Sequence, residues 1–292
     1  MKQRTIKKPV EVVGIGLHKG VPVKLRLEPL GENEGIIFYR SDKGVSIPLR
    51  PENVVDTKMA TVIGKEGAVI STIEHLMSAV YAFGIDNLRI IVDNDEVPIL
   101  DGSANGFVMM IKEAGIEELK TSKKFLRITK EVEIKENQKF AKLKPCKDIL
   151  FDFEIYFDHP MIGREKYRFE FSTQNYIQEI ARARTFGFLK EVQYLRSIGL
   201  ALGGSLENAI VLDDNGILNE NLRYPDEFVR HKILDAIGDM SLFGYNFIGE
   251  YEAFASGHYL NHLLTLKVLE EEAYEIVSFD TALEMSIAKA FG

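Results

Sequence analysis

Histidine and aspartate occur at helical spacing around residue 235. In the stretch 229–240, His231 and Asp235 are four residues apart, so a helix would place both side chains on one face, about 5–6 Å from each other. Asp239 continues the same stripe. A neutral imidazole and a carboxylate at this spacing can bind one metal ion without distorting a helix. On this stretch alone an ordinary surface pair of histidine and aspartate is the favoured interpretation, because such pairs are common, so a metal site needs a third ligand and a base from elsewhere.

His75, which follows Glu74 directly, is a candidate for that third ligand. A catalytic zinc site uses three protein ligands and keeps one position open for water. His75, His231 and Asp235 can supply these ligands. Glu74 would then lie beside the metal without binding it, where a general base belongs. His258 lies where a predicted strand gives way to a helix, and side chains at such places point into clefts.

Other catalytic patterns are weaker. Gly203-Gly204-Ser205 lacks the glycine that a nucleophile elbow needs two positions after its serine, because Glu207 stands there. The remaining histidines, His18, His159 and His262, fit structural roles. The sequence therefore favours metal chemistry over serine catalysis.

The composition narrows the class of protein. The chain has 292 residues, 46% of them hydrophobic and 27% charged, which is enough for two hydrophobic cores. A net charge of −8 argues against nucleic-acid binding. The single cysteine, Cys146, excludes an internal disulfide and a thiolate zinc cluster, and it suits a reducing cytoplasm. No apolar run reaches the length of a transmembrane helix, so we expect a cytoplasmic protein with at most peripheral membrane contact.

Strands and helices are mixed along both halves of the chain. Alternation of apolar and polar residues predicts strands at 10–17, 21–27, 36–39, 45–48, 60–63, 88–92, 125–128, 132–134, 139–143, 150–157, 168–171, 209–212 and 248–255. Helical spacing predicts helices from 71 to 83 and at 104–114, 176–183, 189–198, 229–240 and 259–272. The first of these helices opens with Ser71 and Glu74, which fit a capping box. The predicted fold class is α+β.

Residues 115–125 are mostly charged and polar, and we place a domain boundary there. The predicted domains are 1–120, which carries Glu74 and His75, and 125–292, which carries His231, Asp235 and His258. Both halves have the same rough order of strands and helices, so a duplicated architecture is a hypothesis.

Several motifs together resemble the UDP-3-O-acyl-N-acetylglucosamine deacetylases of lipid A biosynthesis. The similarity runs in order from about residue 3 to about residue 280. The motifs that carry it are Glu74-His75, Pro98-Ile-Leu-Asp-Gly-Ser103, Ala181-Arg-Ala-Arg-Thr-Phe186, Gly203-Gly-Ser205, Arg230-His-Lys-x-x-Asp-x-x-Gly-Asp239 and Ser256-Gly-His258.

The resemblance implies a fold and a reaction. The fold would be two layered α/β sandwich domains related by pseudo-duplication, with helices packed between two sheets. The reaction would be zinc-dependent hydrolysis of an N-acetyl group on a UDP-linked, 3-O-acylated glucosamine. The implied site has zinc ligands His75, His231 and Asp235, general base Glu74, general acid His258 positioned by Asp239, a positive charge from Lys232 and an oxyanion donor in Thr185.

The resemblance also implies where the substrate lies. Phe157 and Lys139 match positions that contact the uridine diphosphate. The acyl chain would lie in a passage formed by the segment after Thr185, with Phe186, Val192, Gly204, Ser205, Leu206, Ala209 and Val211 as candidates. Some relatives have a cysteine where this chain has Ala60, so an extra metal held by that cysteine is not expected. We expect a monomer whose partner is the UDP-sugar substrate.

Two alternatives remain open at this point. The same ligands could serve another zinc hydrolase, such as a different sugar or peptide amidase. The fold could also serve as a nucleotide-sugar or acyl-carrier binding module without catalysis, which would bind no metal. The presence of Glu74 and His258 beside a full ligand set favours an enzyme, because a binding module does not need them.

Overall fold

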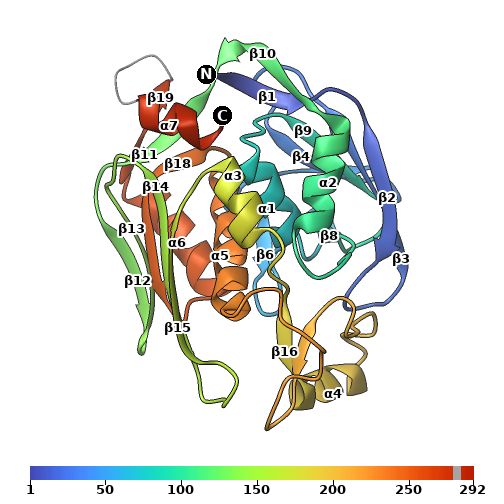
Figure 1. Cartoon of the computed structure of the whole chain (residues 1–292). Coiled ribbons are helices and arrows are strands. Elements are labelled where there is room, and N and C mark those ends of the chain that lie inside the picture. Colours follow the sequence, from blue (N-terminus) through green and yellow to red (C-terminus); the bar gives the residue numbers. More distant parts are fainter. Residues whose placement is uncertain (279–283) are drawn as a thin grey trace.

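The computed structural model describes residues 1–278 and 284–292 of the chain. Its α-helices are α1 (Glu74–Ala82), α2 (Asn105–Ala114), α3 (Thr173–Asn175), α4 (Leu189–Ser197), α5 (Glu227–Met240), α6 (His258–Glu270) and α7 (Glu284–Ala290), with a π-helical turn at Tyr176–Ile180. The mixture of helices and several sheets confirms the predicted α+β class. Two sheets lie on either side of the central helices α1, α5 and α6 (Figure 1).

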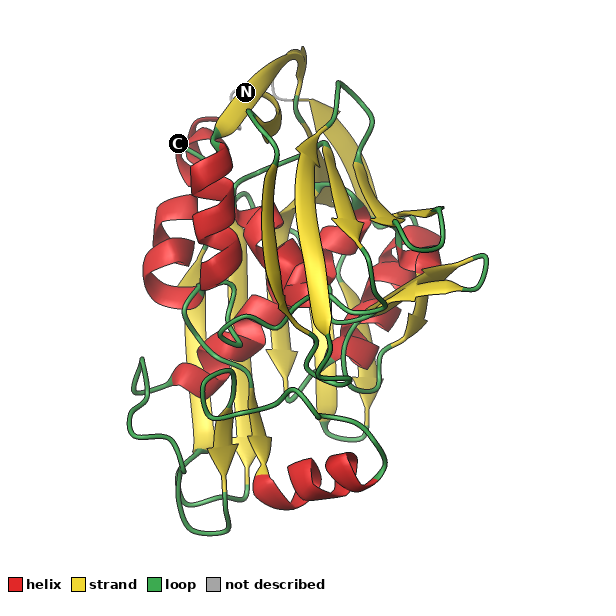
Figure 2. Ribbon diagram, turned by 90° about the vertical axis from the view of Figure 1, so that its right-hand side faces the viewer, coloured by secondary structure: helices red, strands yellow, loops and turns green. Residues whose placement is uncertain are grey.

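The first sheet has the strand order β2-β3-β9-β4-β5. These strands are β2 (Val10–Ile15), β3 (Pro22–Pro29), β4 (Ile36–Arg40), β5 (Val45–Pro48) and β9 (Leu88–Val92). All neighbours are antiparallel except β4 and β9. Alternate residues of β3 are buried, because one face of the sheet covers the helices and the other faces solvent (Figure 2).

The second sheet is built around the long strand β18 (Asn246–Phe254). It also contains β11 (Lys124–Ile128), β12 (Val132–Glu136), β13 (Lys139–Lys144), β14 (Ile149–Phe157), β15 (Gly163–Glu170) and β19 (Tyr274–Ser278). Strand β18 pairs antiparallel with β13 and parallel with β14. The run β12-β13-β18-β14-β15 thus has the same sequence of pairings as the first sheet. The predicted pseudo-duplication itself stays a prediction.

The smaller strands complete the scaffold. They are β1 (Lys2–Ile6), β6 (Val54–Asp56), β7 (Val62–Lys65), β8 (Ala68–Ile70), β10 (Ile116–Ser122), β16 (Phe186–Phe188) and β17 (Ile210–Leu212). Strand β10 pairs with β1 and lies in the polar stretch where we predicted the domain boundary, which stays a prediction. Strands β16 and β17 pair in parallel and project with α4 from the lower end of the molecule (Figure 1).

The central helices α1 and α5 are unusually buried. Every residue of α1 is buried, as are most residues of α5, which is typical of helices covered on all sides. Gly238 lets the two helices approach closely, because a Cβ atom there would lie 2.1 Å from the backbone oxygen of Glu74. Glycine costs about 1 kcal/mol relative to alanine inside a helix, and here it lets the helices that carry His75 and His231 lie close together.

The predicted capping box at Ser71 is wrong. Helix α1 begins at Glu74 with Ile73 as its N-cap, and no side chain caps it. Ser71 instead forms a β-bridge with Glu96. The carboxylate of Glu74 accepts a hydrogen bond from the backbone N–H of Thr61, over 3.1 Å. The side chain of Glu74, which the local pattern assigned to the helix end, therefore makes a tertiary contact with Thr61 instead.

We expect Glu165→Gln to stabilise the protein above neutral pH. Burial raises the pKa of the half-buried Glu165 to about 7, although its carboxylate accepts a hydrogen bond from Val229 N. A carboxyl group whose pKa rises on folding binds its proton more tightly in the native state, so its stabilising contribution is present below the unfolded pKa and is lost as the pH rises through 7.

Urea denaturation at several pH values tests this. At pH 8 we expect the free energy of unfolding of the variant to exceed that of the parent by about 1 kcal/mol. This value is reduced for solvent screening, because the site is half-exposed. The two proteins should be equally stable at about pH 3, where Glu165 is protonated in both the native and the unfolded state. A difference that does not change with pH would contradict the assignment.

Candidate active site

Helices α1 and α5 bring together three side chains that could hold a metal ion. The Nε2 atoms of His75 and His231 each lie 3.3 Å from Oδ1 of Asp235. All three side chains are buried, and among the described residues they form one of two groups of three with ligand atoms close enough to share an ion. Side chains that lie 156 positions apart in the sequence, those of His75 and His231, thus meet at one point.

The donor set fits a zinc ion. Oδ1 of Asp235 is buried and accepts no hydrogen bond of good geometry from any described residue, and an unsatisfied buried carboxylate oxygen is costly. Ligand atoms about 2.0–2.1 Å from a tetrahedral zinc ion lie about 3.3–3.4 Å apart, and each of the two histidine nitrogens lies at this separation from Oδ1 of Asp235. Burial would raise the pKa of Asp235, but His231 and His75 lower it well below its usual range, so the carboxylate is ionised.

Glu74 lies beside this cluster and is 3% exposed. Its Oε2 accepts the Thr61 N–H, and its Oε1 lies 3.5 Å from Nε2 of His258. Burial raises the pKa of Glu74, although the nearby His258 opposes this. A carboxylate whose pKa moves toward neutrality is a better general base than an ordinary surface glutamate.

His258 is held by a buried aspartate. Its Nδ1 lies 2.8 Å from Oδ2 of Asp239, which is 1% exposed. The same Asp239 accepts hydrogen bonds from the Thr61 hydroxyl (2.6 Å) and the Asn261 amide (2.9 Å). Burial alone would lower the pKa of His258, but Asp239 and Glu74 outweigh it and raise the pKa to about 10. The imidazole is therefore positively charged at pH 7.

A cavity of about 520 Å³ opens over these groups. Of the predicted site residues, its lining includes Glu74, His75, Lys139, Phe157, Thr185, Phe186, His231, Lys232, Asp235 and His258. Asp239 does not line the cavity, but its carboxylate contacts His258, which does. The predicted residues outside the lining are Val192, Gly204, Ser205, Leu206, Ala209 and Val211. They lie in the region from α4 to β17, and their role in an acyl passage stays a prediction.

Thr185, which directly precedes β16, and Lys232, which lies on α5, both line the cavity. The backbone N–H of Thr185 donates to the carbonyl of Gly102 over 2.8 Å. Gly102 has a φ of +82°, and a Cβ there would lie 2.0 Å from the oxygen of Asn208, so glycine is required for this contact. The ammonium of Lys232 lies 3.8 Å from Oδ2 of Asp235, which places a positive charge at the ligand cluster.

Aromatic rings form the outer wall. Phe157 makes an edge contact with Phe186, with ring centroids 5.6 Å apart, and a tilted contact with Phe188. Lys139 is exposed on β13 nearby. An aromatic face together with a cation suits a base and a phosphate, and the contact of Phe157 and Lys139 with a uridine diphosphate stays a prediction.

Two functional neighbours were missed by the sequence reasoning. Thr61 links Glu74 to Asp239, because its N–H donates to the first and its hydroxyl to the second. Asn261 fixes Asp239 from helix α6. Neither residue has a local signal, apart from the spacing of Asn261 three positions after His258 on a helix.

Comparison with known proteins identifies the family. The family model of the UDP-3-O-acyl N-acetylglycosamine deacetylases matches residues 3–270. Among curated proteins, UDP-3-O-acyl-N-acetylglucosamine deacetylases from Nautilia profundicola and Nitratiruptor sp. are 77% and 67% identical, covering 100% and 97% of this chain and 100% and 96% of their own. The enzyme of that name from Wolinella succinogenes is 63% identical, over 100% of this chain and 99% of its own. None of the described helices is long and apolar enough to cross a membrane. The chain belongs to the UDP-3-O-acyl N-acetylglycosamine deacetylase family.

Proposed function

We propose that this deacetylase is a zinc-dependent amidohydrolase of lipid A biosynthesis that acts on UDP-3-O-acyl-N-acetylglucosamine. It releases acetate and leaves UDP-3-O-acyl-glucosamine, which commits the sugar to the pathway. The observation that carries the proposal is the meeting of two histidine nitrogens on an unsatisfied carboxylate oxygen of Asp235, with Glu74 and His258 directly beside it. The names of the curated relatives support the substrate.

His75, His231 and Asp235 would hold the ion. An amide is a poor electrophile, and water at pH 7 is a poor nucleophile. Zinc, when bound, polarises the carbonyl and lowers the pKa of the attacking water to about 7. The protein supplies the remaining proton transfers and the positioning.

Glu74 accepts the proton of the water as the carbonyl is attacked. Its Oε2 is fixed by Thr61, and its Oε1 is left facing His258. Loss of a positioned base or acid costs roughly 10²–10⁴-fold in rate. His258 then protonates the departing amine, for which it must carry a proton at neutral pH, and the buried Asp239 holds it in that state.

The developing oxyanion needs donors. Thr185 and the protonated His258 both line the cavity, and loss of one such donor costs about 3 kcal/mol. Phe157 and Lys139 would contact the uridine diphosphate, since an aromatic ring and a cation suit a base and a phosphate. Burial of the acyl chain contributes about 0.8 kcal/mol per CH₂ group, so the predicted passage should act chiefly on substrate affinity.

Acetate release from UDP-3-O-acyl-N-acetylglucosamine tests the proposal directly. We expect release by the zinc-loaded protein, loss of release after treatment with a chelator and recovery when zinc is added back. The matched control is the same acylated N-acetylglucosamine without UDP, for which we expect a much lower kcat/KM. The reaction would take place in the cytoplasm, with which the single Cys146 agrees.

Other outcomes would identify the rival functions. Equal turnover of substrates with and without UDP would indicate a different zinc amidase. Substrate binding without acetate release by metal-loaded protein would indicate a binding module and would refute the proposal.

A further inference from the structure

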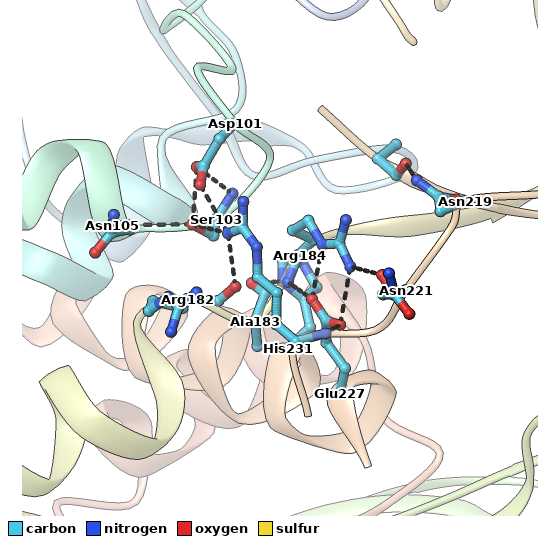
Figure 3. A network of polar contacts seen from close by, with 12 residues as sticks. Asp101, Ser103, Asn105, Arg182, Ala183, Arg184, Asn219, Asn221, Glu227 and His231 are labelled. Atoms are coloured by element: carbon cyan, nitrogen blue, oxygen red, sulfur yellow. Dashed lines mark hydrogen bonds and ion pairs between the residues drawn. The ribbon is translucent and has the colours of Figure 1, made fainter. Parts of the chain in front are cut away.

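One peptide group is held between two side chains of helix α5. Nδ1 of His231 lies 2.9 Å from the carbonyl oxygen of Ala183. The next backbone N–H, that of Arg184, donates to Oε1 of Glu227 over 3.0 Å. The carbonyl of residue 183 and the N–H of residue 184 belong to the same peptide group. Glu227 and His231 are four residues apart on one helix, and they contact opposite sides of this group (Figure 3).

The contact fixes which nitrogen of His231 is free. A carbonyl oxygen only accepts hydrogen bonds, so the His231 Nδ1 that faces it must carry the hydrogen. Nε2 is then left with its lone pair directed at Asp235. The other ligand histidine has no such support, because Nδ1 of His75 is buried and has no hydrogen-bond partner among the described residues. Orientation of the ligand set therefore depends on the contact to the carbonyl of Ala183.

Glu227 is a buried carboxylate whose hydrogen-bond partners among the described residues are all donors. It is 0% exposed. Its Oε1 accepts from the backbone N and from Nε of Arg184, and its Oε2 accepts from Nη2 of Arg184 and from the N–H of Arg223. A negative charge at the N–H end of a peptide group increases the electron density on its carbonyl oxygen, since hydrogen bonds in a chain polarise one another.

We propose that Glu227 is a positioning residue that acts on the metal ligand His231 through the peptide group of residues 183 and 184. The carboxylate strengthens the Ala183 carbonyl as an acceptor, and the carbonyl in turn orients the imidazole and makes its Nε2 a stronger donor to the ion. Metal-binding histidines commonly donate their other N–H directly to a carboxylate or carbonyl. Here the carbonyl of Ala183 contacts the imidazole of His231, and the carboxylate of Glu227 accepts a hydrogen bond from the N–H of the same peptide group. The inference rests on the proposed zinc site.

The alternative role of Glu227 is to neutralise Arg184, which is 8% exposed. Removal of either partner of a buried ion pair leaves the other charge unpaired and destabilises the fold. Three variants separate the two roles. Arg184→Met removes the guanidinium and keeps the backbone N–H; Glu227→Gln removes the negative charge; and the double variant removes both charges, so that no buried charge of this pair is left alone.

The measured quantity is the zinc dissociation constant, obtained by competition with a chromogenic chelator. We expect Arg184→Met to change it less than threefold, and Glu227→Gln to weaken zinc binding about tenfold, at the lower end of the effect of such supporting groups. The double variant should be at least as stable to urea as Arg184→Met, because no charge of the pair is left unpaired in it, and it should still bind zinc about tenfold more weakly. A double variant that binds zinc like Arg184→Met would overturn the proposal.

Nitrogen chemical shifts of the His231 ring provide a readout that does not depend on activity. We expect the metal-free parent and Arg184→Met to show hydrogen on Nδ1 alone, and the double variant to show a mixture of the two neutral forms. A single form in all three proteins would contradict the proposed role. If the parent protein takes up no zinc at all, the proposed function fails; if the parent binds zinc and the variants match it, only the inference about Glu227 fails.

Discussion

Glu74→Gln is expected to lower kcat by roughly 10²–10⁴-fold while the protein keeps its full zinc content. The glutamine has the shape of the glutamate, and its oxygen can still accept the N–H of Thr61 that Oε2 accepts in the parent. It cannot take a proton from water. The change leaves the ligand atoms of His75, His231 and Asp235 in place. The zinc content should therefore stay the same while the turnover falls.

Glu74→Asp is the matched comparison. It keeps a carboxylate but withdraws it by the length of one methylene group, and a displacement of about 1 Å can cost 10²-fold in rate. We expect a rate between those of the parent and of Glu74→Gln. Elemental analysis gives the zinc content and acetate release gives the rate. Unchanged turnover in Glu74→Gln would remove the residue from its role, and zinc loss would make it part of the metal site instead.

His231→Ala is expected to abolish activity by a different route, through loss of the metal. The substitution removes one of the two histidine nitrogens that lie 3.3 Å from Asp235 Oδ1. Structural zinc sites, which have four protein ligands, bind the ion with on the order of 10–16 kcal/mol. A quarter of this energy is about 2.5–4 kcal/mol for one ligand, so loss of His231 should weaken binding by roughly 10²–10³-fold. The variant should therefore be isolated with little zinc.

His159→Ala serves as the control for a lost imidazole. His159 lies at the turn between β14 and β15, where its Nε2 contacts the carbonyl of Asp213, and it does not line the cavity. Its zinc content should equal that of the parent. Partial activity recovered by His231→Ala at high zinc concentration would agree with the assignment, whereas full zinc occupancy after dialysis would refute the ligand set.

Local pattern predicted most elements that carry the site. The alternation of residues in β2, β3 and β14 and the helical spacing of α2, α5 and α6 survive in the structure with ends shifted by a few residues, because each periodicity matches one buried face. The elements that were missed are short, and they include β1, β6, β8, β10, β16, β19 and α7. Strand β10 is largely exposed or half-buried and polar, so its pairing with β1 leaves no alternating apolar signal to read.

Spacing along the chain determined part of the site and left the rest open. The i, i+4 spacing of His231 and Asp235 places both on one face of any helix that forms there, so this half of the ligand set follows from sequence. Nothing in the sequence fixes where His75 lies relative to them. That depends on the close approach of α1 to α5 at Gly238.

Only the tertiary structure decided the electrostatic state of the site. Thr61, Asn261 and Glu227 come from three separate elements or their edges and act through hydrogen bonds to Glu74, Asp239 and the peptide group beside His231. A sequence specifies which groups can titrate or donate. Whether a carboxylate is a base, a support for a histidine or a partner of an arginine depends on burial and on neighbours within a few ångströms, and those are set when distant segments pack together.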